Sequence, residues 1–136
     1  LEHLADRFPG TDVAPPAGSP ERVRFHFWVA WISNNPMAAF YRWFKADAMI
    51  DAAHVEALQA GAIRNLEGQG RWLEEQLAGR EWLCGDRCTA ADAFLLEMVG
   101  WAGFVEGLVL GGPNVAAHAA RTAAHPAVAR ARVDED

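Results

Sequence analysis

Aromatic and amide side chains between positions 31 and 38 offer the clearest binding chemistry in the sequence. Trp31, Asn34, Asn35 and Ala38 recur at helical spacing, so they share one face of a predicted helix. Two amides beside an apolar wall can orient a small polar group while the wall removes the rest of a ligand from water. A second domain or subunit could cover the same face, and the residue pattern leaves both interpretations open.

The cysteines and histidines form no recognisable metal or redox motif. Cys84 and Cys88 enclose three residues, whereas redox pairs and zinc knuckles enclose two. Cys88 precedes a helix start, where we favour a thiol packed in a hydrophobic staple over one activated by the helix N-terminus. His118 and His125 have no cysteine or acidic residue near them in sequence, so we expect solvated histidines and no metal site.

Motifs of catalytic sites are absent from the sequence. It contains no glycine-rich phosphate loop, no nucleophile elbow and no His-Glu-x-x-His segment. The acidic pair Glu74 and Glu75 falls on the polar face of a predicted helix, where solvation explains it better than acid–base catalysis. We therefore expect no catalytic residue in this chain.

The helix that carries Trp31 is predicted over about 20–45 and has two apolar faces. Ser19 and Pro20 supply its start signal, and Pro36 predicts a kink near Asn34 and Asn35 because proline lacks the N–H of a helical hydrogen bond. One apolar face contains Phe25, Trp28, Val29 and Ile32, and the roughly opposite one contains Phe27, Trp31, Asn34, Asn35 and Ala38. A surface helix needs one apolar stripe, so the second face indicates a partner outside the core of this chain.

The remaining elements are also predicted to be helical. An amphipathic helix is expected over 51–78, an almost wholly apolar and therefore central helix over 93–104, and a short alanine-rich helix over 115–124 that restarts after His125. Thr89 and Asp92 match a capping box in which aspartate replaces glutamate. No segment alternates as a strand would, so the predicted fold is an all-α bundle of about five helices with a kinked first long helix.

Composition restricts both the size and the partners of the protein. A chain of 136 residues suits one domain, and its formal charge of −6 argues against nucleic acid as a partner. No apolar run reaches the roughly 18 residues of a membrane span, so we expect no membrane partner. The cysteine content does not resemble a disulfide framework, and the sequence predicts a cytoplasmic chain. Residues 1–9 resemble a helix end, residues 10–19 a proline-rich linker, and residues 20–133 the helical domain.

The order of these signals resembles the glutathione transferase superfamily. Residues 1–9 are similar to the end of the last helix of its thioredoxin-like domain, and 10–19 to its interdomain connection. The most specific match is Trp82-Leu83-Cys84-Gly85-Asp86-Arg87-Cys88-Thr89-Ala90-Ala91-Asp92-Ala93, which resembles the segment with the buried capping box. The resemblance covers essentially the whole chain and implies the C-terminal helical domain, with the thioredoxin-like domain missing.

This resemblance implies a function that the residues alone do not. Members of the family are usually homodimers that bind glutathione in the first domain and a small electrophilic substrate in a cleft walled by the helical domain. Asn34 and Asn35 then lie near the cleft, where some bacterial members carry a histidine–lysine pair. The chain alone is expected to be inactive, because the thiolate-activating residue belongs to the first domain. A non-catalytic helical module for protein assembly, or a ligand carrier, remains an alternative.

Overall fold

The structure, a computed structural model, describes residues 2–8 and 10–133, and all of its regular elements are helices. They are α1 (Glu2–Arg7), α2 (Pro20–Asn34), α3 (Pro36–Phe44), α4 (Ala46–Met49), the 3₁₀ helix η1 (Ala52–His54), α5 (Val55–Leu77), α6 (Ala90–Ala102), α7 (Pro113–Ala124) and α8 (Pro126–Val133). The described residues contain no strand, so the predicted all-α class is confirmed. With α2 and α3 taken as one kinked helix, the five predicted helices are present; α4 was not foreseen, and the start of the helix predicted over 51–78 forms η1.

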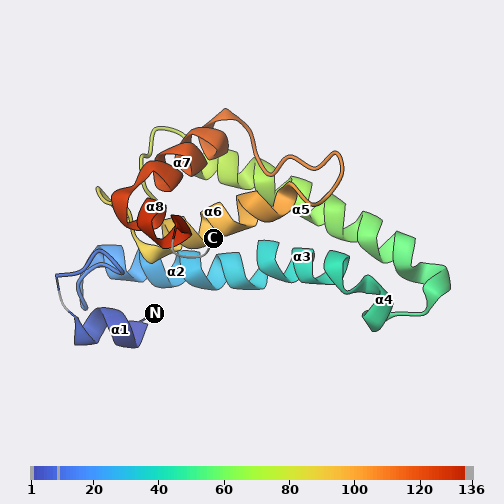
Figure 1. Cartoon of the computed structure of the whole chain (residues 1–136), viewed down its shortest axis with the longest axis horizontal. Helices are drawn as coiled ribbons and strands as arrows, with labels where there is room; N and C mark the ends of the chain where they lie inside the picture. Colours follow the sequence, from blue (N-terminus) through green and yellow to red (C-terminus); the bar gives the residue numbers. More distant parts are fainter. Residues whose placement is uncertain (1, 9, 134–136) are drawn as a thin grey trace.

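The long first helix breaks where proline predicts it. The Ser19 side chain accepts a hydrogen bond from the Arg22 N–H at 3.1 Å and caps α2. Asn35, with φ −114° and ψ −84°, leaves the helical conformation, and Pro36 begins α3. Figure 1 shows α2 and α3 following one another along the long axis of the molecule. The kink therefore lies at the residue that joins the two halves of the predicted binding face.

The core forms around α6, which contacts α2, α3 and α7 (Figure 1). The inner face of α2 contributes three buried apolar side chains, Phe25, Trp28 and Ile32. They pack into one apolar cluster with residues of α5, α6 and α7, which include Leu66, Leu73, Leu95, Met98 and Val115. An almost wholly apolar helix requires neighbours on several sides, and α6 has them.

Two glycines let α5 touch the loop before α7 through their backbones. A Cβ atom at Gly70 would lie 2.5 Å from the Gly111 nitrogen. Gly111 itself has φ +93°, and a Cβ atom there would overlap the Val115 side chain at 2.4 Å. A side chain at Gly70 cannot be accommodated without displacing the backbone of the loop, and one at Gly111 would meet the Val115 side chain in a backbone conformation that favours glycine. This contact fixes the loop 103–112 against the middle of α5.

The segment before α2 lies alongside the start of that helix (Figure 1). Ala5 of α1 is buried, whereas Leu4 and Phe8 are about half exposed. The two ends of the predicted 1–9 segment, Leu1 and Pro9, fall outside the described residues. Among the described helices, none combines the length and apolar character needed to cross a bilayer.

Candidate functional site

Trp31 faces α5 rather than open space. Its ring centroid lies 4.6 Å from that of Trp72 and 5.8 Å from that of Trp28. Trp31 and Trp72 border a shallow groove of about 350 Å³, whose other lining residues are Arg64, Asn65, Gly68 and Gln69. The groove lies between α2 and α5, and we call it the α2–α5 groove.

The two predicted amides are bonded to their own helix. Asn34 donates from Nδ2 to the Ala30 carbonyl at 2.8 Å, and Asn35 donates from Nδ2 to the Trp31 carbonyl at 3.0 Å. Asn34 is exposed, whereas Asn35 and Ala38 are partly buried. Of these four residues only Trp31 borders the α2–α5 groove, so the predicted set is spread over the helix surface on both sides of the kink.

An apolar stripe that the sequence reasoning missed continues from Asn34 along α3. Met37, Tyr41 and Phe44 follow at steps of three and four residues and are all exposed, with Tyr41 at 59%. The Phe44 ring packs against the ring of Phe104, and the two ring centroids lie 6.4 Å apart. Phe104 is 71% exposed. We call Met37, Tyr41, Phe44 and Phe104 the α3 stripe. The helical spacing was visible in the sequence, but the predicted face ended at Ala38.

A contiguous exposed apolar surface of this kind usually marks an interaction or ligand site. On its inner side Phe44 packs against two further rings. Its ring centroid lies 6.2 Å from that of Phe40 and 5.9 Å from that of Trp101. Phe40 is fully buried in the core. The α3 stripe is therefore an exposed layer of aromatic and thioether groups on a rigid base, which can bind a flat apolar molecule.

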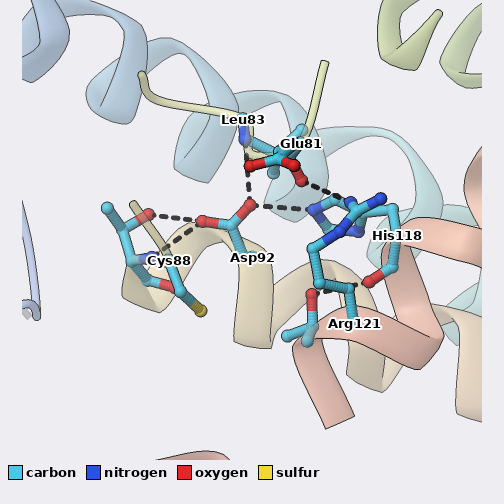
Figure 2. A network of polar contacts seen from close by, with 8 residues as sticks. Glu81, Leu83, Cys88, Asp92, His118 and Arg121 are labelled. Atoms are coloured by element: carbon cyan, nitrogen blue, oxygen red, sulfur yellow. Dashed lines mark hydrogen bonds and ion pairs between the residues drawn. The ribbon is translucent and has the colours of Figure 1, made fainter. Parts of the chain in front are cut away.

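A second group of residues forms a buried polar network around Asp92. Its carboxylate accepts hydrogen bonds from the Leu83 N–H at 2.9 Å, the Thr89 N–H at 2.8 Å and the Thr89 hydroxyl at 2.9 Å. His118 Nε2 lies 2.8 Å from the other side of the carboxylate, on the oxygen that Leu83 also contacts. Figure 2 shows Asp92 between Leu83 and His118. Thr89 and Asp92 form the capping box of α6.

The expectation that His118 is solvated was wrong. The residue is 1% exposed and packs between Asp92 and the edge of the Trp82 ring, whose centroid is 6.2 Å away. The reason is its position on α7: Val115, Ala119 and Thr122 share its face and are also buried. The acidic partner that the sequence seemed to lack lies 26 positions earlier in the chain.

The two cysteine thiols are in environments that disfavour reactivity. Cys84 and Cys88 are free cysteines, and both are buried. Burial raises the pKa of each thiol to about 12, and the Asp92 carboxylate acts in the same direction. Because the thiolate is the nucleophile, neither cysteine suits attack on a substrate at neutral pH. The geometry favours a packed Cys88 over an activated one.

The solvated interpretation of Glu74 was also wrong. Its carboxylate accepts three backbone hydrogen bonds at the start of α7, from the N–H groups of Gly112 at 2.9 Å, Asn114 at 2.8 Å and Val115 at 3.0 Å. Partial burial raises the pKa of Glu74, but these hydrogen bonds outweigh it and hold the pKa below its ordinary value. Glu74 thus caps a helix that begins 39 positions later.

Glu74→Gln is expected to lower the free energy of unfolding by about 1 kcal/mol, because the amide cannot serve all three N–H groups. A carboxyl group whose pKa is lowered by folding stabilises above its unfolded pKa, about 4.3 for glutamate, and loses that effect as pH falls further. The deficit should therefore be full at pH 7 and shrink below about pH 4. Urea denaturation at pH 7 and below pH 4 tests this. Glu75→Gln, a substitution of the exposed neighbour, is the control and should change the free energy of unfolding little at either pH.

Comparison with known proteins identifies the family. The family described as glutathione S-transferase, C-terminal domain, matches residues 52–130. This chain belongs to the glutathione S-transferase family. The match spans α5, α6, α7 and the Asp92 network, and the all-helical chain is the C-terminal domain type of that family.

Individual glutathione S-transferases are similar over most of this chain. Glutathione S-transferase GstA of Escherichia coli O157:H7 is 28% identical over 128 residues, which are 94% of this chain and 61% of that protein. Glutathione S-transferase GST-4.5 of Xanthomonas campestris pv. campestris is 28% identical over 108 residues, which are 75% of this chain and 50% of that protein. The chain therefore spans about half to three-fifths of the length of these curated relatives.

Two solved structures have the same fold. A sphingomonad glutathione S-transferase complexed with glutathione superposes with a TM-score of 0.83 at 28% identity, over 99% of this chain and 64% of that chain. A bacterial beta class glutathione S-transferase of Sphingomonas chungbukensis gives a TM-score of 0.78 at 27% identity, with the same coverage. The helical arrangement of this glutathione S-transferase domain is thus that of the family.

Proposed function

We propose that this chain is the helical domain of a glutathione-dependent transferase and that the α3 stripe walls the cleft for an apolar electrophile. The observation that carries the proposal is the exposure of the stripe on a rigid aromatic base. We also propose glutathione as the co-substrate, which the family supports, and a cytoplasmic compartment, which the two free thiols support. The residue that activates the glutathione thiol belongs to the remainder of the protein, because the buried thiols of this chain are unsuited to it.

The stripe supplies binding and positioning rather than a reactive group. Its side chains are a thioether, a phenol and two phenyl rings, with no charged residue among them. Apolar burial contributes about 25 cal/mol per Å² of surface, so a flat aromatic electrophile would gain most of its affinity here. Holding the electrophile in a water-excluded cleft beside the glutathione thiolate accelerates attack by proximity and orientation. Asn34 lies at one end of the stripe, where its carboxamide oxygen can accept a hydrogen bond from a polar substituent.

Substitution in the full-length protein tests this role. Tyr41→Ser is expected to raise the KM for 1-chloro-2,4-dinitrobenzene by roughly five- to tenfold, the loss of one aromatic contact, and to leave the KM for glutathione unchanged. Val23→Ser is the control, because Val23 is also an exposed hydrophobic residue, at 69%, but lies at the start of α2. An unchanged KM for 1-chloro-2,4-dinitrobenzene in Tyr41→Ser would show that the α3 stripe does not line the substrate cleft. A full-length protein with no glutathione-dependent turnover would instead favour the non-catalytic assembly module.

We further propose that the α2–α5 groove contacts a second copy in a homodimer. Gly61 and Gly68 lie seven residues apart on α5, and a Cβ atom at either would meet only the tip of an arginine side chain. A glycine within a helix costs about 1 kcal/mol relative to alanine, so these glycines suit a close approach by another chain. The half-buried indoles of Trp31 and Trp72 also line the groove, and within the described residues the Gln69 Oε1 atom is buried without a hydrogen-bond partner.

Gly68→Gln is expected to shift the full-length protein from dimer to monomer, because the side chain fills the space left for the partner. Gly100→Gln is the matched control, since Gly100 is also a helical glycine with open space around it, but on α6. Sedimentation equilibrium measures the outcome. A dimer that persists in Gly68→Gln would exclude this groove as the contact.

A further inference from the structure

Arg22 is a buried cation that joins three consecutive segments of the chain. Its side chain is 8% exposed. It donates from Nη2 to Asp6 Oδ1 of α1 and from Nη1 to the Pro15 carbonyl of the linker, both at 2.8 Å. On α2 itself, Arg22 Nε donates to His26 Nε2 at 3.0 Å. A planar guanidinium with a partner on each of its three nitrogens has a fixed orientation, so these contacts hold α1 and the linker in one position on α2.

A further hydrogen bond joins the linker to α6. The Val13 carbonyl accepts from the Ala90 N–H at 2.9 Å. Ala90 is the first residue of α6, where a backbone N–H has no partner within its own helix. The linker thus supplies part of the cap of α6, next to the capping box of Thr89 and Asp92. Residues 13–15 are therefore bonded to α6 and, through Arg22, to α2.

Close packing does not fix the linker along its whole length. A cavity of about 630 Å³ is lined by the linker, by the loop 84–87 and by Arg22. One ion pair at this cavity joins Arg87 Nη1 to Asp12 Oδ1 at 3.3 Å, but the two side chains are 69% and 55% exposed. Exposed ion pairs contribute little to stability. The hydrogen bonds of the buried Arg22 are therefore the stronger restraint on where α1 and the linker lie.

We propose that Arg22 is a positioning residue for the transfer reaction, because its contacts set where the glutathione thiolate lies relative to the α3 stripe. This inference rests on the proposed function, in which glutathione binds in the part of the protein that residues 1–9 resemble. Arg22 holds α1 on α2, and α3, which carries most of the stripe, follows α2 along the long axis of the molecule (Figure 1). Arg22 touches neither substrate and acts through the angle between the two parts.

A change in that angle should alter kcat rather than the KM values. Each substrate keeps the residues of its own site, so the KM for glutathione and the KM for the electrophile should each stay within about twofold. The direction and distance of thiolate attack change instead, and a misplacement of about 1 Å can cost roughly a hundredfold in rate. Weakening one of the two contacts should cost less, about three- to tenfold in kcat.

Asp6→Asn in the full-length protein tests the contact between Arg22 and α1. Asp12→Asn is the matched control, because Asp6 and Asp12 are 56% and 55% exposed and both pair with an arginine, but the partner of Asp12 is the exposed Arg87. With 1-chloro-2,4-dinitrobenzene as electrophile, kcat should fall about three- to tenfold in Asp6→Asn and stay within about twofold in Asp12→Asn. Equal kcat values, or a raised KM in place of a lowered kcat, would overturn the proposal.

Arg22→Gln removes the contacts with α1 and with the linker together, so its kcat should fall further, by roughly ten- to a hundredfold. Adding Asp6→Asn to Arg22→Gln should then lower kcat little more, because both substitutions remove the same ion pair. Effects that multiply in the double variant would show that Asp6 acts independently of Arg22, contrary to the proposal. Asp6→Asn leaves the bond to the Pro15 carbonyl in place, so it decides the question if Arg22→Gln does not fold.

Hydrogen exchange distinguishes a failure of this inference from a failure of the proposed function. The Phe8 amide bonds to the Leu4 carbonyl at 3.0 Å and reports on α1. It should exchange about two- to fivefold faster in Asp6→Asn than in Asp12→Asn, whether or not the protein is a transferase. Equal exchange in the two variants would show that Arg22 does not hold α1. A full-length protein without glutathione-dependent turnover would instead refute the proposed function and, with it, the kinetic role of Arg22.

Discussion

Asp92→Ala is expected to lower the free energy of unfolding by about 3–5 kcal/mol. The substitution leaves the N–H of Leu83, the N–H and hydroxyl of Thr89, and the ring of His118 without an acceptor in a site that water does not reach. Each buried polar group without a partner costs about 1–3 kcal/mol, and relaxation of the loop recovers part of the total. The effect exceeds that of an ordinary lost helix cap, about 1 kcal/mol, because the carboxylate joins three segments.

Urea denaturation followed by tryptophan fluorescence measures this loss. Asp86→Ala is the matched control, because the Asp86 side chain is 95% exposed in the same loop and its removal should change stability by less than about 0.5 kcal/mol. If Asp92→Ala and Asp86→Ala unfold at the same urea concentration, the network does not stabilise the fold.

Gly70→Ala is expected to lower the free energy of unfolding by about 2–4 kcal/mol. The added methyl group would lie 2.5 Å from the Gly111 nitrogen and 3.3 Å from the carbonyl carbon of Leu110, which are backbone atoms and cannot rotate away. Relief requires moving the loop before α7, and that loop also places the N–H groups that Glu74 caps.

Gly100→Ala is the same substitution at another helical glycine, and we expect it to change stability in the opposite direction. Gly100 lies within α6 with no atom near the position of a new Cβ, so the substitution should stabilise by up to about 1 kcal/mol through helix propensity. Thermal unfolding of both variants separates steric overlap from propensity. A Gly70→Ala variant as stable as the parent would mean that α5 and the loop can separate without loss.

Local signals in the sequence were sufficient for the fold class and for several helix ends. Ser19 and Pro20 start α2, Pro36 breaks the long helix, and Thr89 and Asp92 lie where capping-box spacing places them. Each signal acts through atoms within four residues, so it can be recognised without knowing the tertiary structure. The predicted amphipathic character of α5 is likewise confirmed, because Leu66 and Leu73, seven residues apart, are both fully buried.

Contacts between distant segments could not be predicted in this way. Glu74 caps α7 from 38 to 41 positions away, and His118 meets Asp92 across 26. Helical periodicity assigns a residue to a face, but it does not say which helix covers that face, and so it did not show that Trp31 packs on Trp72 of α5. Met37, Tyr41 and Phe44 were within reach of the same periodicity, had the face been followed past Ala38.

The reactivity of the two buried thiols can report how often this domain opens transiently. Cys84 follows Leu83, and Cys88 precedes Thr89, so both flank donors of the Asp92 carboxylate. A thiol reagent can modify either sulfur only after this corner of the molecule has opened to solvent and the proton has left. The rate of labelling in undenatured protein therefore measures how often the corner opens, without any added probe.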